Sequence, residues 1–260
     1  MLRGMWSAAS GMAAQQMTID VIANNLANVN TTSFKKSRAE FQDLMYQTIS
    51  QSGAETSGGS QIPTGIQIGM GTMPLGVHKV FMQGDFQETK NELDMVIEGK
   101  GFFKVLSNDE ELYTRAGNFK LDADGNICTA NGDKLQPEMA VPTDTVNIQI
   151  DGAGTVTVFN SSGEGTSLGE IELYTFPNTA GLFSIGHNLY RSTDASGEAI
   201  SGTPGSDGVG TILRGFLEMS NVDVVKEMVS MIAAQRAYEI NSKAIQTADS
   251  MLQIANNIKR

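Results

Sequence analysis

The chain has 260 residues, enough for one large domain or two modest ones. Its composition is 40% hydrophobic and 18% charged, which excludes a membrane-embedded chain and a highly charged disordered polymer. The net charge of -11 disfavours nucleic acid as a partner, because phosphate backbones attract cations. One cysteine and two histidines leave few ligands for a metal centre. We therefore expect no catalytic residues, no cofactor and no metal.

Residues 1–32 are predicted to form an N-terminal helix. Met5, Met12, Ile19 and Leu26 recur every seven residues, and Ile22 lies beside this stripe. Alanine, methionine and asparagine replace the leucine and isoleucine of a strong coiled coil, so such a helix is marginal by itself.

The N-terminal segment also lacks the continuous apolar region of a cleaved secretory signal. No part of the chain approaches the roughly 20 apolar residues that a membrane-spanning helix needs. We expect a protein that is not inserted in a membrane. If it works outside the cytoplasm, it is expected to leave without a cleaved signal peptide.

Residues 33–75 are predicted to form an extended connecting stretch. Within it, Ser50–Thr64 is rich in serine and glycine, which is typical of a flexible linker. Ser192–Gly210 has the same character. We expect each of these segments to separate a terminal helix from the middle of the chain.

A small basic cluster, Lys35, Lys36 and Arg38, opens this connecting stretch. Two interpretations are equally favoured from the sequence. The cluster is either a solvated face or a set of cations that pair with the carboxylates of a neighbouring acidic subunit.

Residues 76–216 are predicted to form a mostly antiparallel β domain, because short runs of β-branched and aromatic residues alternate with glycine and asparagine. No helical period interrupts the region, which disfavours parallel βαβ units. Asp124-Gly125-Asn126 and Asn131-Gly132-Asp133 are typical hairpin turns. The predicted strands are Gly76–Phe81, Leu93–Ile97, Gly101–Leu106, Leu112–Thr114, Phe119–Leu121, Val146–Ile150, Thr155–Phe159 and Ile171–Phe176.

Residues 217–260 are predicted to form a long C-terminal helix, on the order of 55 Å at about 1.5 Å per residue. Ser220 or Asn221 is the expected N-cap, and Asp223 and Glu227 place negative charge where the helix dipole favours it. Apolar residues step by three or four along one face of this segment. Its many alanines bury little area, so neighbouring subunits are expected to cover it.

The predicted fold class is α+β, with long N- and C-terminal helices in a coiled-coil-like core and a central β domain. The helix seams are predicted to be the interface between subunits. The predicted interface residues are Met5, Met12, Ile19, Ile22, Leu26, Val225, Val229, Ile232, Ala237, Ile240, Ala244, Ala248, Met251, Ala255 and Ile258.

Three long motifs resemble the bacterial flagellar rod and hook axial proteins. Residues Ala23–Tyr46 are similar to the N-terminal signature of that family. Gln83–Val105 and Tyr113–Ile127 resemble its shared β domain, and Gly215–Leu252 its C-terminal signature. The length excludes the larger hook protein, and an insertion over Gln47–Gln67 makes the match closest to the distal rod proteins. The chain departs from the family at Thr32-Ser33, where a glycine usually lies beside the phenylalanine.

The resemblance implies a structural subunit of the distal rod, a part of the flagellar basal body. Such subunits stack helically into a hollow driveshaft that crosses the periplasm, with the helices lining the export channel. The implied partners are further copies of the chain, the proximal rod proteins and the hook protein. They also include the periplasmic and outer-membrane bushing rings and the flagellar type III export apparatus.

Two further interpretations compete with the distal rod. A proximal rod subunit shares the same β domain. An adhesive or carbohydrate-binding β module would explain the middle of the chain but leaves both amphipathic ends unused. An enzyme is disfavoured because no convergent set of acid, base or nucleophile is visible.

Overall fold

A computed structural model describes residues 2–53, 63–161, 163–206 and 208–258. The chain divides into two compact units. Unit 1 comprises Met1–Leu26, Ser37–His78 and Asp223–Arg260, and unit 2 comprises Ala27–Lys36 and Lys79–Val222. The backbone therefore passes between the units at four points, 26/27, 36/37, 78/79 and 222/223. The four-segment domain division expected from the sequence stays a prediction.

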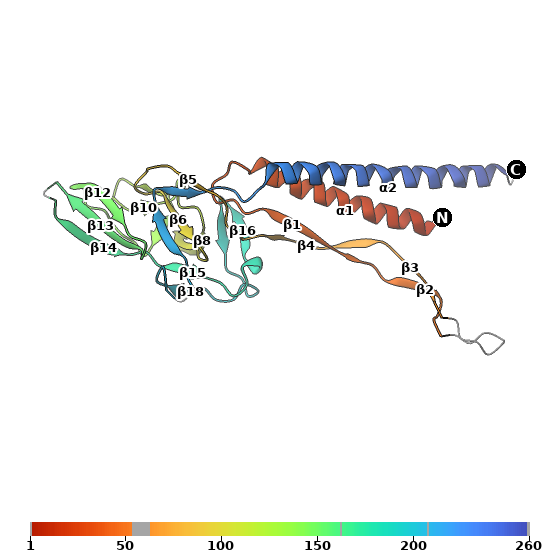
Figure 1. Cartoon of the computed structure of the whole chain (residues 1–260), viewed down its shortest axis with the longest axis horizontal. Helices are drawn as coiled ribbons and strands as arrows, with labels where there is room; N and C mark the ends of the chain where they lie inside the picture. Colours follow the sequence, from red (N-terminus) through yellow and green to blue (C-terminus); the bar gives the residue numbers. More distant parts are fainter. Residues whose placement is uncertain (1, 54–62, 162, 207, 259–260) are drawn as a thin grey trace. The chain divides into compact units, whose positions relative to one another are not determined.

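Unit 1 contains both terminal helices, α1 at Leu2–Ala27 and α2 at Val224–Ile258. They run antiparallel and side by side (Figure 1), since Asn25 lies near the start of α2 and Gly11 lies beside Asn241. At about 1.5 Å per residue, the 35 residues of α2 span roughly 52 Å. In the described part of the chain, neither helix combines the length and apolarity that crossing a bilayer requires.

The N-cap of α2 is Asp223, and the prediction of Ser220 or Asn221 is wrong. The Asp223 carboxylate accepts hydrogen bonds from the backbone N–H groups of Val225 and Lys226, at 3.1 and 3.2 Å. It thereby satisfies two of the donors that a helix start leaves unpaired. The side chain of Asn221 is used elsewhere, as described below.

The remainder of unit 1 is a β arm formed by two strand pairs. Strand β1 (Ser37–Asp43) pairs with β4 (Thr72–Lys79), and β2 (Tyr46–Ser50) pairs antiparallel with β3 (Ile66–Gly69). The segment Ser50–Thr64 lies between β2 and β3, and most of it, residues 54–62, is outside the described residues.

Unit 2 is the predicted β domain, and its strand pairs are antiparallel. Its largest sheet has seven strands in the order β16-β17-β8-β7-β11-β10-β9. In chain order these are β7 (Phe103–Ser107), β8 (Glu110–Thr114), β9 (Lys120–Leu121), β10 (Ile127–Cys128), β11 (Lys134–Gln136), β16 (Phe183–Gly186) and β17 (Leu189–Arg191).

Smaller sheets complete unit 2. A three-stranded sheet contains β12 (Thr145–Ile150), β13 (Thr155–Asn160) and β14 (Gly165–Glu170). Three pairs join β5 (Phe86–Glu88) to β20 (Phe216–Glu218), β6 (Met95–Glu98) to β19 (Thr211–Arg214), and β15 (Leu173–Thr175) to β18 (Ile200–Gly202). A short 3₁₀ helix covers Thr179–Gly181.

The predicted strands and turns are confirmed, with end points that shift by a few residues. Each predicted strand overlaps an observed one, and Gly125 and Gly132 adopt φ values of 81° and 91° in the hairpins that flank β10. The prediction that Ser192–Gly210 links the β domain to a helix is wrong. That segment lies inside unit 2, where it contains β18 and the fully buried Ser196.

The core of unit 2 is made by alternating strand residues that point between the sheets. Aromatic rings form a second cluster, in which Phe81, Phe102, Phe176 and Tyr190 meet edge to face at centroid distances of 5.2 to 6.0 Å. Fully buried members of the main cluster are Met95, Ile97, Phe103, Val105, Val156, Val158, Ile171 and Leu173.

Candidate assembly surfaces

The inner face between α1 and α2 is narrow and lined by small residues. Ala8, Ala14 and Ile22 of α1 are buried, and Ala234 of α2 is buried as well. Small side chains let the helices approach closely but remove little apolar area from water. The helix pair by itself therefore leaves most of its apolar surface exposed.

The predicted interface residues separate into three groups. Ile22 is buried, and Met5, Met12, Ile19, Leu26, Ala237 and Ala248 are half-buried. The exposed group is Val225, Val229, Ile232, Ile240, Ala244, Met251 and Ala255. Ile258 is the last residue of α2, and its side chain lies outside the described residues.

The exposed apolar residues form a stripe along the outer side of α2. Val225 is 71% exposed and Ile240 is 67% exposed, and Ile254 extends the row beyond the predicted set. At about 100° per residue, the exposed group and Ile254 fall within an arc of about 140° on the side of α2 that faces away from Ala234. Helix α2 thus has two apolar faces, of which α1 covers one. A single seam was predicted because the sequence does not say which face meets α1.

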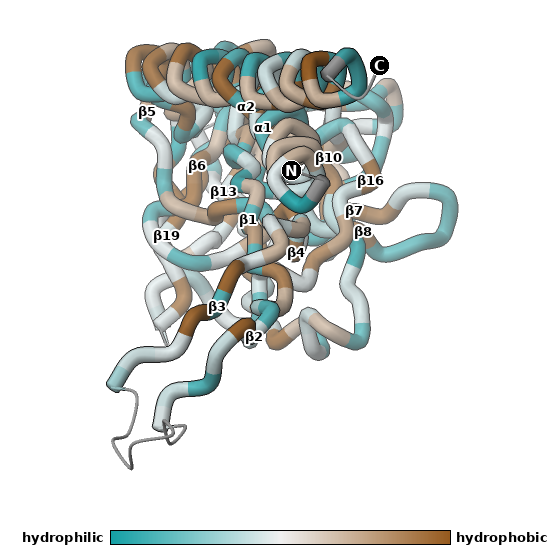
Figure 2. Tube along the Cα trace, turned by 90° about the vertical axis from the view of Figure 1, so that its right-hand side faces the viewer, coloured by the Kyte–Doolittle hydropathy of each residue, from teal (hydrophilic) through white to brown (hydrophobic). Residues whose placement is uncertain are grey.

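The β arm carries a second exposed apolar surface, which the sequence analysis missed. Figure 2 shows it as brown segments on β2 and β3. Met45 is 84% exposed, and the other exposed large apolar residues of the β arm are Tyr46, Ile49, Ile66, Ile68, Met70, Met73, Leu75 and Val77. The alternation in Ile66-Gln67-Ile68 could have indicated a strand, but the neighbouring serine and glycine suggested a linker.

The turn between α1 and β1 is held by a buried asparagine. Asn25 is 1% exposed, and its carboxamide both donates to and accepts from the backbone of Ser37, at 2.9 and 2.8 Å. It also donates to Glu227 of α2 at 3.3 Å. Asparagine has a low helix propensity, yet here its side chain joins α1, β1 and α2.

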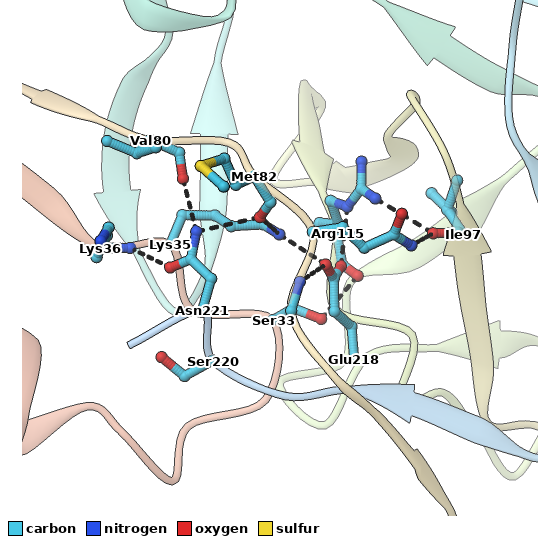
Figure 3. Close-up of polar contacts among 12 residues, drawn as sticks. Ser33, Lys35, Lys36, Val80, Met82, Ile97, Arg115, Glu218, Ser220 and Asn221 are labelled. Atoms are coloured by element: carbon cyan, nitrogen blue, oxygen red, sulfur yellow. Dashed lines mark hydrogen bonds and ion pairs between the residues drawn. The ribbon is translucent and has the colours of Figure 1, made fainter. Parts of the chain in front are cut away.

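Unit 2 contains a buried ionic cluster centred on Glu218 (Figure 3). Its carboxylate lies 2.7 Å from the Lys35 ammonium and 2.8 Å from the Arg115 Nε, and both the Lys35 and Glu218 side chains are fully buried. Burial lowers the pKa of Lys35, and the nearby positive charge of Arg115 acts in the same direction, while Glu218 opposes the shift. One carboxylate therefore serves two buried cations.

Both interpretations of the basic cluster fail at Lys35, which is neither solvated nor available to a neighbouring subunit. Its partner Glu218 is 183 residues away in the same chain. Arg38 is exposed and pairs with Glu40 at 2.7 Å. A local run of cations carries no signal for a long-range partner, so the sequence could not identify the pair.

Backbone geometry at Ser33 explains how the chain accommodates the missing glycine. Ser33 has a left-handed backbone with φ of 57°, a region that glycine enters without steric cost. Its hydroxyl donates to the Arg115 carbonyl at 2.9 Å, and its N–H donates to the Glu218 carbonyl at 2.7 Å. Glycine could make the backbone bond but not the hydroxyl bond, so the hydroxyl bond is what serine adds against the strain of a side chain at this position.

Comparison with known proteins identifies the family. Three family models match the chain at the places where the motifs lie. Residues 5–35 match the flagella basal body rod protein model, and residues 96–158 match the D1 domain of flagellar hook protein FlgE/F/G. Residues 213–258 match the C-terminal model of the flagellar basal body rod FlgEFG proteins.

Relatives from several bacteria match this chain over its full length, and each is a flagellar basal-body rod protein FlgG. The chain is 50% identical to the flagellar basal-body rod protein FlgG of Borreliella burgdorferi, with 100% of both chains covered. It is 44% identical to that of Caulobacter vibrioides over 99% of this chain and all of the relative, and 41% identical to that of Bacillus subtilis over the whole of both. The chain therefore belongs to the FlgG family of flagellar basal-body rod proteins.

Proposed function

We propose that this chain is the structural subunit of the distal flagellar rod, which polymerises helically into a hollow shaft and carries motor torque to the hook. The observation that carries the proposal is the outer apolar stripe of α2, which the described residues of α1 leave exposed. The insertion that favours the distal rod over the proximal rod lies within the region aligned to the full-length relatives.

Burial of the exposed surfaces supplies the driving force for assembly. Each aliphatic side chain that passes from water into a packed interface contributes about 1.5–3 kcal/mol. The stripe on α2 and the apolar surface of the β arm are different patches of unit 1. Contacts that differ on the two sides of a subunit build a closed ring or an open helical polymer, and the proposed shaft is the open polymer.

In the proposed shaft, the helices of unit 1 form a coiled-coil-like inner core around the export channel. Proximal rod proteins, the hook protein and the bushing rings are the proposed neighbours along and around the rod. The subunit is proposed to reach the periplasm through the flagellar type III export apparatus, as the family resemblance implies. The proposed function is structural and involves no catalysis.

The test is assembly of the full-length chain carrying Ile240→Glu in the outer stripe. A buried carboxylate would oppose the interface, so we expect the variant to stay monomeric where the unaltered chain forms polymers. Sedimentation and negative-stain electron microscopy measure the outcome. Gln235→Glu adds the same charge to an exposed site outside the stripe and should leave polymer growth intact.

Three results would contradict the proposal. Polymers of normal length from Ile240→Glu would remove the stripe from the interface. A monomeric unaltered chain that binds glycans would instead favour the adhesive or carbohydrate-binding module. Incorporation of the chain into the membrane-proximal part of the rod would favour the proximal subunit.

A further inference from the structure

Four stretches of backbone connect unit 2 to the rest of the chain, and we call them connecting strands although most of their residues lie outside the β-strands given above. Three of the four lie side by side within unit 2. They end at Lys36, begin at Lys79 and end at Val222. The Val80 N–H donates to the Lys36 carbonyl at 2.9 Å, and the Asn221 N–H donates to the Phe34 carbonyl at 3.4 Å. The Ser33 N–H also donates to the Glu218 carbonyl at 2.7 Å, and the Met219 N–H donates to the Asp85 carbonyl at 2.8 Å, but these scattered bonds do not form a regular ladder.

The side chain of Asn221 joins all three strands (Figure 3). Its oxygen accepts the Lys36 N–H at 2.8 Å, and its nitrogen donates to the carbonyls of Val80 and Met82 at 2.8 and 3.1 Å. The carboxamide oxygen thus binds the strand that ends at Lys36, and the nitrogen binds the strand that begins at Lys79. Asn221 itself belongs to the third strand.

Three residues earlier, Glu218 binds the same strands through charge. Besides Lys35 and Arg115, its carboxylate accepts the Gly84 N–H at 2.9 Å. The Lys35 ammonium also donates to the Met82 carbonyl at 2.7 Å, so Lys35, the ionic partner of Glu218, and Asn221 both bind this carbonyl. Arg115 adds hydrogen bonds to the carbonyls of Ile97, Gly99 and Gly101 in the body of the β domain.

The ionic part of this network, Lys35, Arg115 and Glu218, is buried, and Asn221 is half-buried, so we expect the network to open as a whole. If one strand leaves, Glu218 or Lys35 stays behind as a desolvated charge without its partner, which is more costly than the loss of an exposed hydrogen bond. A fully satisfied buried network can therefore contribute more stability than the sum of its separate bonds.

We propose that Glu218 and Asn221 form one cooperative clamp that fastens three of the four connecting strands to the β domain. The clamp makes a pull along any one strand act on all three and, through Arg115, on the domain body. This load-sharing role rests on the proposed function as a torque-bearing subunit. The cooperative clamp itself is a property of unit 2 and needs no assembly.

Native-state hydrogen exchange on the dilute full-length chain tests the clamp. In the unaltered chain, the amides of Ser33, Val80 and Met219 should share one opening equilibrium with a common denaturant dependence. None of these three amides bonds to the Asn221 side chain. Asn221→Ala should nevertheless speed the exchange of all three by about tenfold or more, while the core amide of Val105 stays unchanged.

The controls separate a clamp from a set of independent bonds. Glu218→Gln should speed the same three amides, although it alters the other half of the network. Asn178→Ala removes a single hydrogen bond to the Ala195 carbonyl elsewhere in unit 2 and should leave them unaffected. Faster exchange at Lys36 alone in Asn221→Ala would overturn the clamp. Should the variants fail to fold, unequal openings of the three amides in the unaltered chain would also overturn it.

Bending of assembled rods tests the load-sharing role separately. Rods that contain Asn221→Ala chains should have a shorter persistence length in electron micrographs than rods of the unaltered chain. Equal stiffness would overturn load sharing and leave the exchange result standing. Failure of the unaltered chain to polymerise would contradict the proposed function and leave the clamp unaffected.

Discussion

Lys35 and Glu218, 183 residues apart in the chain, form a fully buried ion pair with 2.7 Å between the ammonium nitrogen and the nearer carboxylate oxygen. The second carboxylate oxygen binds Arg115, so the three groups depend on one another. An ion pair in this setting contributes little net stability when intact but is costly to break from one side.

Removal of the cation should therefore destabilise unit 2 strongly. We expect Lys35→Ala to reduce the free energy of unfolding by about 3–5 kcal/mol, because Glu218 is left with one of its two buried cations. The matched control is Glu110→Ala, which breaks the half-exposed pair with Arg191 and should cost at most about 1 kcal/mol. Denaturant unfolding of the full-length chain measures both. Equal losses in the two variants would contradict a structural role for the buried pair.

Substitutions at Ser33 should separate backbone strain from hydrogen bonding. Ser33→Gly loses the bond to Arg115 but gains a residue suited to φ of 57°. Ser33→Ala loses the same bond and keeps the strain, so it should be less stable than Ser33→Gly by about 1 kcal/mol. Thermal unfolding of the two variants provides the comparison. A more stable alanine variant would show that the left-handed backbone is not costly here.

Buried tyrosines should make the protein lose stability in alkali. Burial raises the pKa of Tyr190 well above its ordinary value of 10.0, with a further increase from Glu218, and burial also raises the pKa of Tyr174 and Tyr113. Above pH 10 the unfolded chain releases protons that the folded chain retains, so the free energy of unfolding falls as pH rises.

Tyr190→Phe should make this fall shallower between pH 9.5 and pH 11, values chosen as about half a unit below and one unit above the tyrosine pKa. Denaturant unfolding at the two pH values measures the difference. Tyr238→Phe, at an exposed position of α2, serves as the control. An unchanged pH dependence in Tyr190→Phe would show that Tyr190 ionises equally in both states.

Loss of the Asp223 cap should reduce the helix content of α2. Backbone and side-chain hydrogen bonds from Lys226 lower the pKa of Asp223, so the charged cap is present above the ordinary value of 3.8 and is lost as pH falls below it. We expect Asp223→Ala to lower the helical circular dichroism signal at pH 7, and Asp223→Asn to retain most of it. Ser220→Ala, at the position first expected to cap the helix, should leave the signal unchanged.

The amino-acid sequence determined the local elements and the family. Helical hydrophobic periods predicted both helices, short runs of β-branched and aromatic residues predicted the principal strands, and Gly125 and Gly132 marked hairpins, because these signals depend on neighbours within a few residues. The family was recognised because its three motifs occur in the sequence in the expected order.

Only the tertiary structure decided which surfaces are covered and which charges are paired. The choice between the two apolar faces of α2 depends on where α1 packs, and the partner of Lys35 depends on a strand that follows much later. The β arm and strand β18, which lies within Ser192–Gly210, were missed for the same reason. Their strands are stabilised by pairing with distant segments, a contribution that composition within a short window does not contain.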